Sequence, residues 1–85
     1  MIDKLEMFIA LANERHFGRA AARHGVTQPS LSAAIRQLEG DLGVQLVMRG
    51  ARFQGLTPEG ERVLDWARRI VTDGRQMRDE MRARR

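Results

Sequence analysis

The segment from Thr27 to Leu38 carries side chains whose chemistry suits hydrogen bonding to another molecule. Leu31, Ile35 and Leu38 lie at helical spacing and are assigned to a core, so the remaining side chains point outward. The outward candidates are Gln28, Pro29, Ser30, Ser32, Ala33 and Arg36. A primary amide both donates and accepts, as an adenine edge does, and a guanidinium bonds to phosphate or guanine. For any one of these residues taken singly, a merely solvated polar face remains the alternative.

Arginine supplies nearly all of the positive charge. The chain has 15 basic residues against 11 acidic ones, a formal net charge of +4, and Lys4 is the single lysine. The planar guanidinium suits phosphates and base edges better than an ammonium does. Nucleic acid is therefore the first partner to consider, although charge alone leaves a protein without such a partner equally open.

Several chemistries lack the residues that they need. The 85 residues contain no cysteine, and the two histidines, His16 and His24, have no carboxylate at metal-ligand spacing. The glycines are scattered singly at turns rather than gathered in a phosphate-binding loop. We therefore expect no catalysis, no cofactor and no metal. No apolar run approaches the roughly 18 residues of a membrane span, and no signal peptide precedes the first helix, so we expect a cytoplasmic protein.

Three helices are predicted in the first half of the chain. Apolar residues at spacings of three and four predict a helix over 2–13. A short alanine-rich helix follows over 19–24, with Gly18 as its N-cap and Gly25 at its end. Thr27 caps the third helix, over 28–39, whose first turn holds Pro29. The short glycine-containing connection between the last two predicts a helix-turn-helix at about 18–37.

A small wing is predicted after the third helix. The segment 44–49 and the segment 53–57 are compatible with two strands, joined by a turn over 50–52. Arg49 at the end of the first strand and Arg19 at the start of the second helix are placed to contact phosphates. An internal ion pair of Arg49 with Glu39 or Asp41 is the alternative.

A long helix is predicted over 58–85, with Thr57 as N-cap and Pro58 in its first turn. Thr57 could cap this helix, contact phosphate, or do both. Apolar and small residues recur along the helix with steps of four and three, as in a coiled-coil seam: Val63, Ala67, Ile70, Gly74, Met77 and Met81. The preceding body is too small to cover such a helix, so a second subunit is expected on the seam.

The prediction is thus a mainly α chain with a winged helix-turn-helix over 1–57 and a dimerisation helix over 58–85. The winged part has a three-helix core and a two-stranded wing at about 44–57. Trp66 is expected to pack either under the wing or at the seam.

The order of motifs along nearly the whole chain resembles the LysR-type transcription regulators of bacteria. The matching stretches are Phe17-Gly18-Arg19-Ala20-Ala21, Val26-Thr27-Gln28-Pro29-Ser30-Leu31-Ser32, Ile35-Arg36-Gln37-Leu38-Glu39, Leu42-Gly43-Val44-Gln45-Leu46, Arg49 and Leu56-Thr57-Pro58-Glu59-Gly60. Three positions depart from the family. Gly18 stands where serine or threonine is usual, His16 replaces a small or polar residue, and Ala33 replaces a polar one that could read a base.

The resemblance implies sequence-specific binding to double-stranded DNA. The helix over 28–39 would enter the major groove, and Arg52 at the wing tip would enter the minor groove. It also implies a homodimer through the last helix, a tetramer of the full-length protein, interrupted palindromic sites rich in A·T pairs, and a C-terminal effector domain, which this chain lacks.

A protein-interaction module is the main rival, because a winged helix can bind proteins and a heptad helix suits a scaffold. Salt-dependent retention on duplex DNA separates the two. RNA is a weaker rival, since no paired aromatics stand on strands to stack bases.

Overall fold

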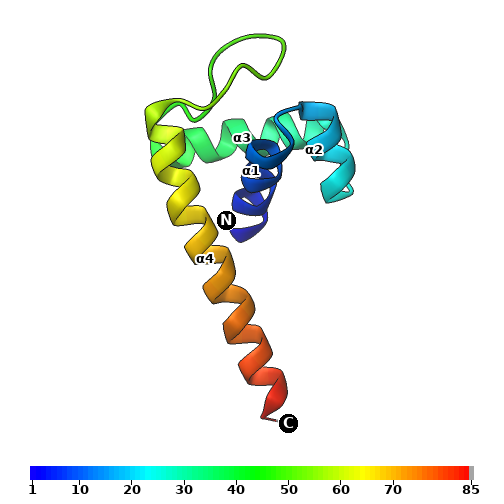
Figure 1. Cartoon of the computed structure of the whole chain (residues 1–85), viewed down its shortest axis with the longest axis vertical. Helices are drawn as coiled ribbons and strands as arrows, with labels where there is room; N and C mark the ends of the chain where they lie inside the picture. Colours follow the sequence, from blue (N-terminus) through cyan, green and yellow to red (C-terminus); the bar gives the residue numbers. More distant parts are fainter. Residues whose placement is uncertain (85) are drawn as a thin grey trace.

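Four helices make up most of the computed structural model, which describes residues 1–84 (Figure 1). They are α1 (Ile2–Glu14), α2 (Phe17–His24), α3 (Gln28–Leu42) and α4 (Pro58–Ala83). The predicted mainly α fold class is confirmed. Among the described residues, no helix combines the length and apolar character that crossing a membrane requires.

The central helix of the fold is α1, which packs against each of the other three. Its residues Leu5, Phe8 and Leu11 are buried, and the last two are fully so. The partners come from all sides of the body: Ala20, Ala21, Leu31, Ile35, Leu38, Leu46, Leu64, Ala67 and Val71. The backbone of α4 comes close only to that of α1 among the described helices, and α4 also rests on the segment 45–47 that follows α3.

The turn between α2 and α3 follows the prediction. Gly25 takes the left-handed conformation (φ 75°) that ends α2. The Thr27 hydroxyl accepts a bond from the Ser30 N–H (3.2 Å) and caps α3. However, α3 runs three residues beyond its predicted end, because its left-handed terminus is Gly43 (φ 71°) and Gly40 lies within the helix.

The start of α2 differs from the prediction. Gly18 is wrong as the N-cap, since the helix begins at Phe17 and its cap is His16. The backbone of His16 is extended, and its Nδ1 accepts a hydrogen bond from the Arg19 N–H at 3.0 Å. A side chain at Gly18 would crowd this ring, because a Cβ there would lie 3.1 Å from His16 Cε1. Gly18 therefore gives the capping imidazole its space.

The two-stranded wing is also corrected. In the described residues this region holds a single antiparallel bridge, between Val47 and Leu56, and residues 48–55 loop out above the body (Figure 1). Gly50 (φ 150°) and Gly55 (φ 122°) have backbone angles outside the β region, so the ladder cannot continue beyond the bridge. The predicted wing is thus a loop closed at its base.

The start of α4 packs against the base of this loop. Thr57 caps α4 by accepting from the Gly60 N–H at 2.9 Å, and donates its own hydroxyl hydrogen to the Gln45 carbonyl at 2.5 Å. At Gly60 a Cβ would lie 2.1 Å from the carbonyl oxygen of Leu46, so only glycine lets the helix approach this closely. The helix then buries Leu64 and Val71 against the body, while its C-terminal end extends away from the body (Figure 1). The predicted last residue of the helix, Arg85, lies outside the described residues.

Gly60→Ala is expected to destabilise the protein by roughly 1–3 kcal/mol, because a methyl group cannot fit against a backbone carbonyl that is held on both sides. Gly40→Ala is the matched control. Gly40 also lies within a helix but faces open space, so alanine should raise stability by up to about 1 kcal/mol. Urea unfolding gives the change in free energy of unfolding for both variants. Equal effects of the two substitutions would contradict a close contact between Gly60 and the Leu46 carbonyl.

His16→Ala should lower the free energy of unfolding by about 1 kcal/mol, because the Arg19 N–H loses its acceptor. His16→Ser is the control, since serine is a favoured cap and keeps an acceptor oxygen. Thermal unfolding followed by circular dichroism gives the comparison. If serine were as harmful as alanine, the imidazole would stabilise α2 by another route.

Candidate nucleic-acid interface

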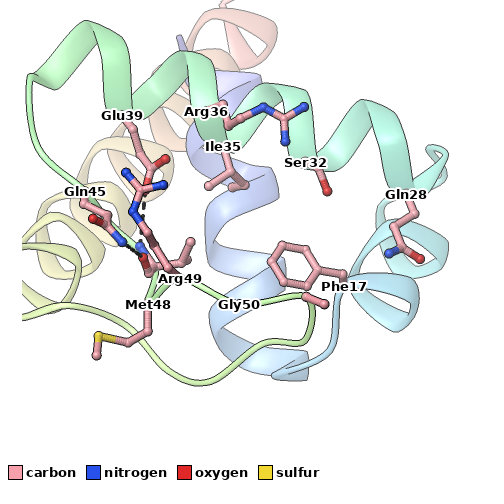
Figure 2. Close-up of a pocket in the computed structure, with 12 residues that line it drawn as sticks. Phe17, Gln28, Ser32, Ile35, Arg36, Glu39, Gln45, Met48, Arg49 and Gly50 are labelled. Atoms are coloured by element: carbon pink, nitrogen blue, oxygen red, sulfur yellow. Dashed lines mark hydrogen bonds between the residues drawn. The ribbon is translucent and has the colours of Figure 1, made fainter.

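A cleft of about 380 Å³ separates α3 from the segment 45–51 (Figure 2). Figure 2 shows Gln28, Ser32 and Arg36 along α3, and Arg49 on the facing segment. All four line the cleft, together with Phe17, Ile35, Glu39, Gln45, Val47, Met48, Gly50 and Ala51. The fold therefore brings the predicted hydrogen-bonding face of α3 and one of the predicted phosphate contacts to a single opening.

The outer face of α3 is accessible, whereas its inner ridge is not. Leu31, Ile35 and Leu38 are at most 2% exposed, as their spacing predicted. Among the predicted binding residues, Gln28, Pro29, Ser30 and Arg36 are exposed, and Ser32 and Ala33 are partly exposed. The Thr27 hydroxyl donates to the Ser30 hydroxyl oxygen at 2.9 Å, which leaves the Ser30 hydrogen available to a ligand at the helix N-terminus.

The cleft is positively charged, although it contains one acid. Glu39 lines the cleft together with Arg36 and Arg49, but its carboxylate accepts hydrogen bonds from the backbone N–H groups of Leu46 (2.7 Å) and Val47 (3.4 Å). This carboxylate therefore holds the base of the loop against α3, and its charge is partly balanced by two N–H dipoles. The two arginines remain as the cations of the opening.

The alternative for Arg49, an internal ion pair, is not observed. Within residues 1–84 the ion pairs are Lys4–Asp41 (3.7 Å) and Glu6–Arg75 (3.3 Å). Asp41 is thus engaged by α1, and Glu39 by the backbone of the loop. This leaves the guanidinium of Arg49 for a ligand of the cleft.

A second cleft, of about 440 Å³, separates the loop tip from the start of α2. Arg52 and Gln28 both line it, so Gln28 stands between the two openings. Arg19 is exposed at the first turn of α2 but lines neither cleft. Sequence reasoning missed Arg15 and Phe53, which also line the second cleft. An aromatic residue within the otherwise polar turn 49–54 was the available signal.

The predicted phosphate contact of Thr57 requires correction. Thr57 is only 8% exposed, and its hydroxyl both donates and accepts within the chain. It is a buried cap that joins the loop to α4. No group of three or more potential metal ligands occurs among residues 1–84.

The predicted seam of α4 divides into two faces. Ala67 is fully buried against the chain's own core, Val63 packs beside it, and Gly74 lies near Ile2. Ala67 is therefore unavailable to a partner, because α1 already covers it. The exposed members are Ile70, Met77 and Met81, and Trp66 joins them, 56% exposed and stacked by the Arg69 guanidinium at 4.3 Å.

Known proteins that resemble this chain are regulators of transcription. Over 69 residues it is 45% identical to the HTH-type transcriptional regulator XapR of Escherichia coli K12, and the match covers 81% of this chain and 24% of XapR. The chain spans about a quarter of the length of XapR and of two further curated relatives that it matches.

Solved structures share the whole fold. A crystal structure of the CbnR DNA-binding domain in complex with DNA superposes with a TM-score of 0.91 at 37% identity, and the match covers 98% of this chain and 95% of that one. A full-length OxyR variant from Pseudomonas aeruginosa gives a TM-score of 0.93 at 36% identity, over 98% of this chain and 28% of that one. Residues 2–61 match the profile of the bacterial regulatory helix-turn-helix proteins of the lysR family. The chain belongs to this LysR family.

Proposed function

We propose that this chain binds double-stranded DNA in a sequence-specific manner, as the DNA-binding part of a bacterial transcription regulator. The observation that carries the proposal is the held orientation of α3. A fully buried ridge fixes the helix, and its outer face opens with Arg36 and Arg49 onto a cleft whose one acid is bound to backbone. The solved complex of the similar CbnR domain with DNA supports it.

Each part of the surface has a role in this proposal. Gln28, Ser32 and Arg36 read base edges in the major groove, with Pro29 and Ala33 beside them as apolar contacts. The N-terminus of α3, at Thr27 and Ser30, together with Arg19 and Arg49, binds phosphates. Arg52 enters the minor groove, whose narrow A·T-rich segments attract a guanidinium. The site is expected to be an interrupted palindrome.

The protein is a binding module rather than an enzyme and acts in the cytoplasm. The similarity to known regulators of transcription supports this part of the proposal. A scaffold without DNA affinity is the rival, and its binding would be indifferent to substitutions at Arg52 and Gln28. In the full-length protein, dimers are expected to assemble further into tetramers.

We further infer that two copies pair through α4. The stripe formed by Trp66, Ile70, Met77 and Met81 is exposed although it is apolar, and its steps of four and seven place it on one side of the helix. An exposed apolar stripe of this length on one helix needs a cover. Pairing with the identical stripe of a second chain is the simplest way to bury it, and the resulting dimer has two DNA-binding surfaces.

Charges beside this stripe favour an antiparallel pair. Arg62 and Arg69 precede position 71 by nine and two residues, and Glu80 and Asp73 follow it by the same steps. All four lie on one flank, and in an antiparallel pair each flank meets its own copy. Arg62 then faces the partner's Glu80, and Arg69 faces the partner's Asp73.

Replacing Arg52 by alanine should weaken binding to duplex DNA about tenfold and reduce the salt slope by about one unit, because one backbone or groove contact is lost. Arg82→Ala is the control, since it removes the same charge at the far end of α4. Fluorescence anisotropy between low and moderate salt measures both. Failure of the wild-type chain to bind any duplex at low salt would overturn the proposed function.

Arg69→Asp should weaken the dimer about tenfold, since it sets an acid against the partner's Asp73. Asp73→Arg should do the same with opposite signs. The double substitution restores both pairs, so sedimentation equilibrium should return a dissociation constant close to that of the wild type. A double variant as weak as either single one would rule out this register.

A further inference from the structure

The loop 48–55 has little backbone support beyond its base. The Met48 N–H donates to the Gly55 carbonyl at 3.0 Å, and the single bridge lies just below this bond. The residues at the tip, from Arg49 to Gln54, have no ladder to hold them. A loop of this kind presents its side chains in many orientations unless another contact fixes it.

One aromatic side chain provides that contact. Phe53 is partly buried, and its ring meets the ring of Phe17 edge to face, with centroids 6.2 Å apart and planes at 69°. This is a favoured geometry for two rings. Phe17 is the first residue of α2, so the tip of the loop is attached directly to the helix-turn-helix.

The guanidinium of Arg15 covers the Phe53 ring, 5.2 Å from its centroid. Its backbone is unusual, because Arg15 is the one non-glycine residue with a positive φ (54°) in the described part of the chain. Glycine would adopt this conformation at the end of α1 without strain. Arginine there is disfavoured by its backbone, and the cation–π contact gives its side chain a role.

We propose that Phe53, held between Phe17 and Arg15, is a positioning residue that sets the place of Arg52 on the DNA-facing side. Arg52 and Phe53 are adjacent in sequence and line the same cleft, so fixing the ring fixes the backbone from which the guanidinium extends. A fixed side chain loses less conformational entropy on binding than a free one. The inference rests on the proposed DNA binding and on the contact made by Arg52.

A double-mutant cycle on the intact chain tests this role. Phe53→Ala should weaken DNA binding about three- to tenfold, and Phe53→Tyr, which keeps the ring, should bind like the wild type. Gln54→Ala, at an exposed position in the same loop, is the control and should have no effect. In an Arg52→Ala background, Phe53→Ala should cause no further loss, because the side chain that it positions is gone.

Arg15→Gly adds a readout that a purely structural role would not give. It should raise the unfolding temperature, since the strained backbone is relieved, and weaken DNA binding, since the ring loses its cover. This weakening should also vanish when Arg52 is absent.

Full additivity of either substitution with Arg52→Ala would overturn the proposal, as would a Phe53→Ala variant that is folded and binds normally. A wild-type chain without affinity for DNA would instead contradict the proposed function itself.

Discussion

The packing of α1 is the constraint on which the rest of the structure depends. Phe8 and Leu11 are fully buried at its centre, and α1 is the one helix that meets the other three. The backbones of α3 and α4 do not approach each other closely, although side chains of both helices belong to the same core. In the dimer proposed above, the distance between the two copies of α3 would therefore depend on the apolar side chains of α1 and on the close contact between Gly60 and Leu46.

Local patterns were sufficient to predict most of the helical part. The ridge of Leu31, Ile35 and Leu38 follows from helical periodicity, and the Thr27 and Thr57 caps follow from one residue and its neighbours. The face of α3 that lines the cleft follows in turn, because burial of the ridge leaves the other side of the helix outward. These inferences need only contacts within a few residues.

The features that were mispredicted depend on contacts or conformations that a short window does not reveal. The His16 cap depends on the space left by Gly18, and the reduction of the two predicted wing strands to one bridge depends on the backbone angles of Gly50 and Gly55. Ala67 has the spacing of a seam residue, but the position of α1 decides which molecule covers it. Thr57 was correctly predicted as a cap, yet its burial beneath the loop, which excludes phosphate contact, depends on the approach of α4 to Gln45.

The carboxylate of Glu39 connects parts of the molecule that are otherwise separate. It projects from α3 and accepts hydrogen bonds from the Leu46 and Val47 N–H groups at the base of the loop. A shift of α3 within one groove of a duplex would consequently carry the loop with it, toward or away from the neighbouring groove. The helix and the loop would then adjust together to a DNA site that differs from the preferred sequence. A mismatched base pair under α3 would also weaken the contacts that the loop makes with the DNA.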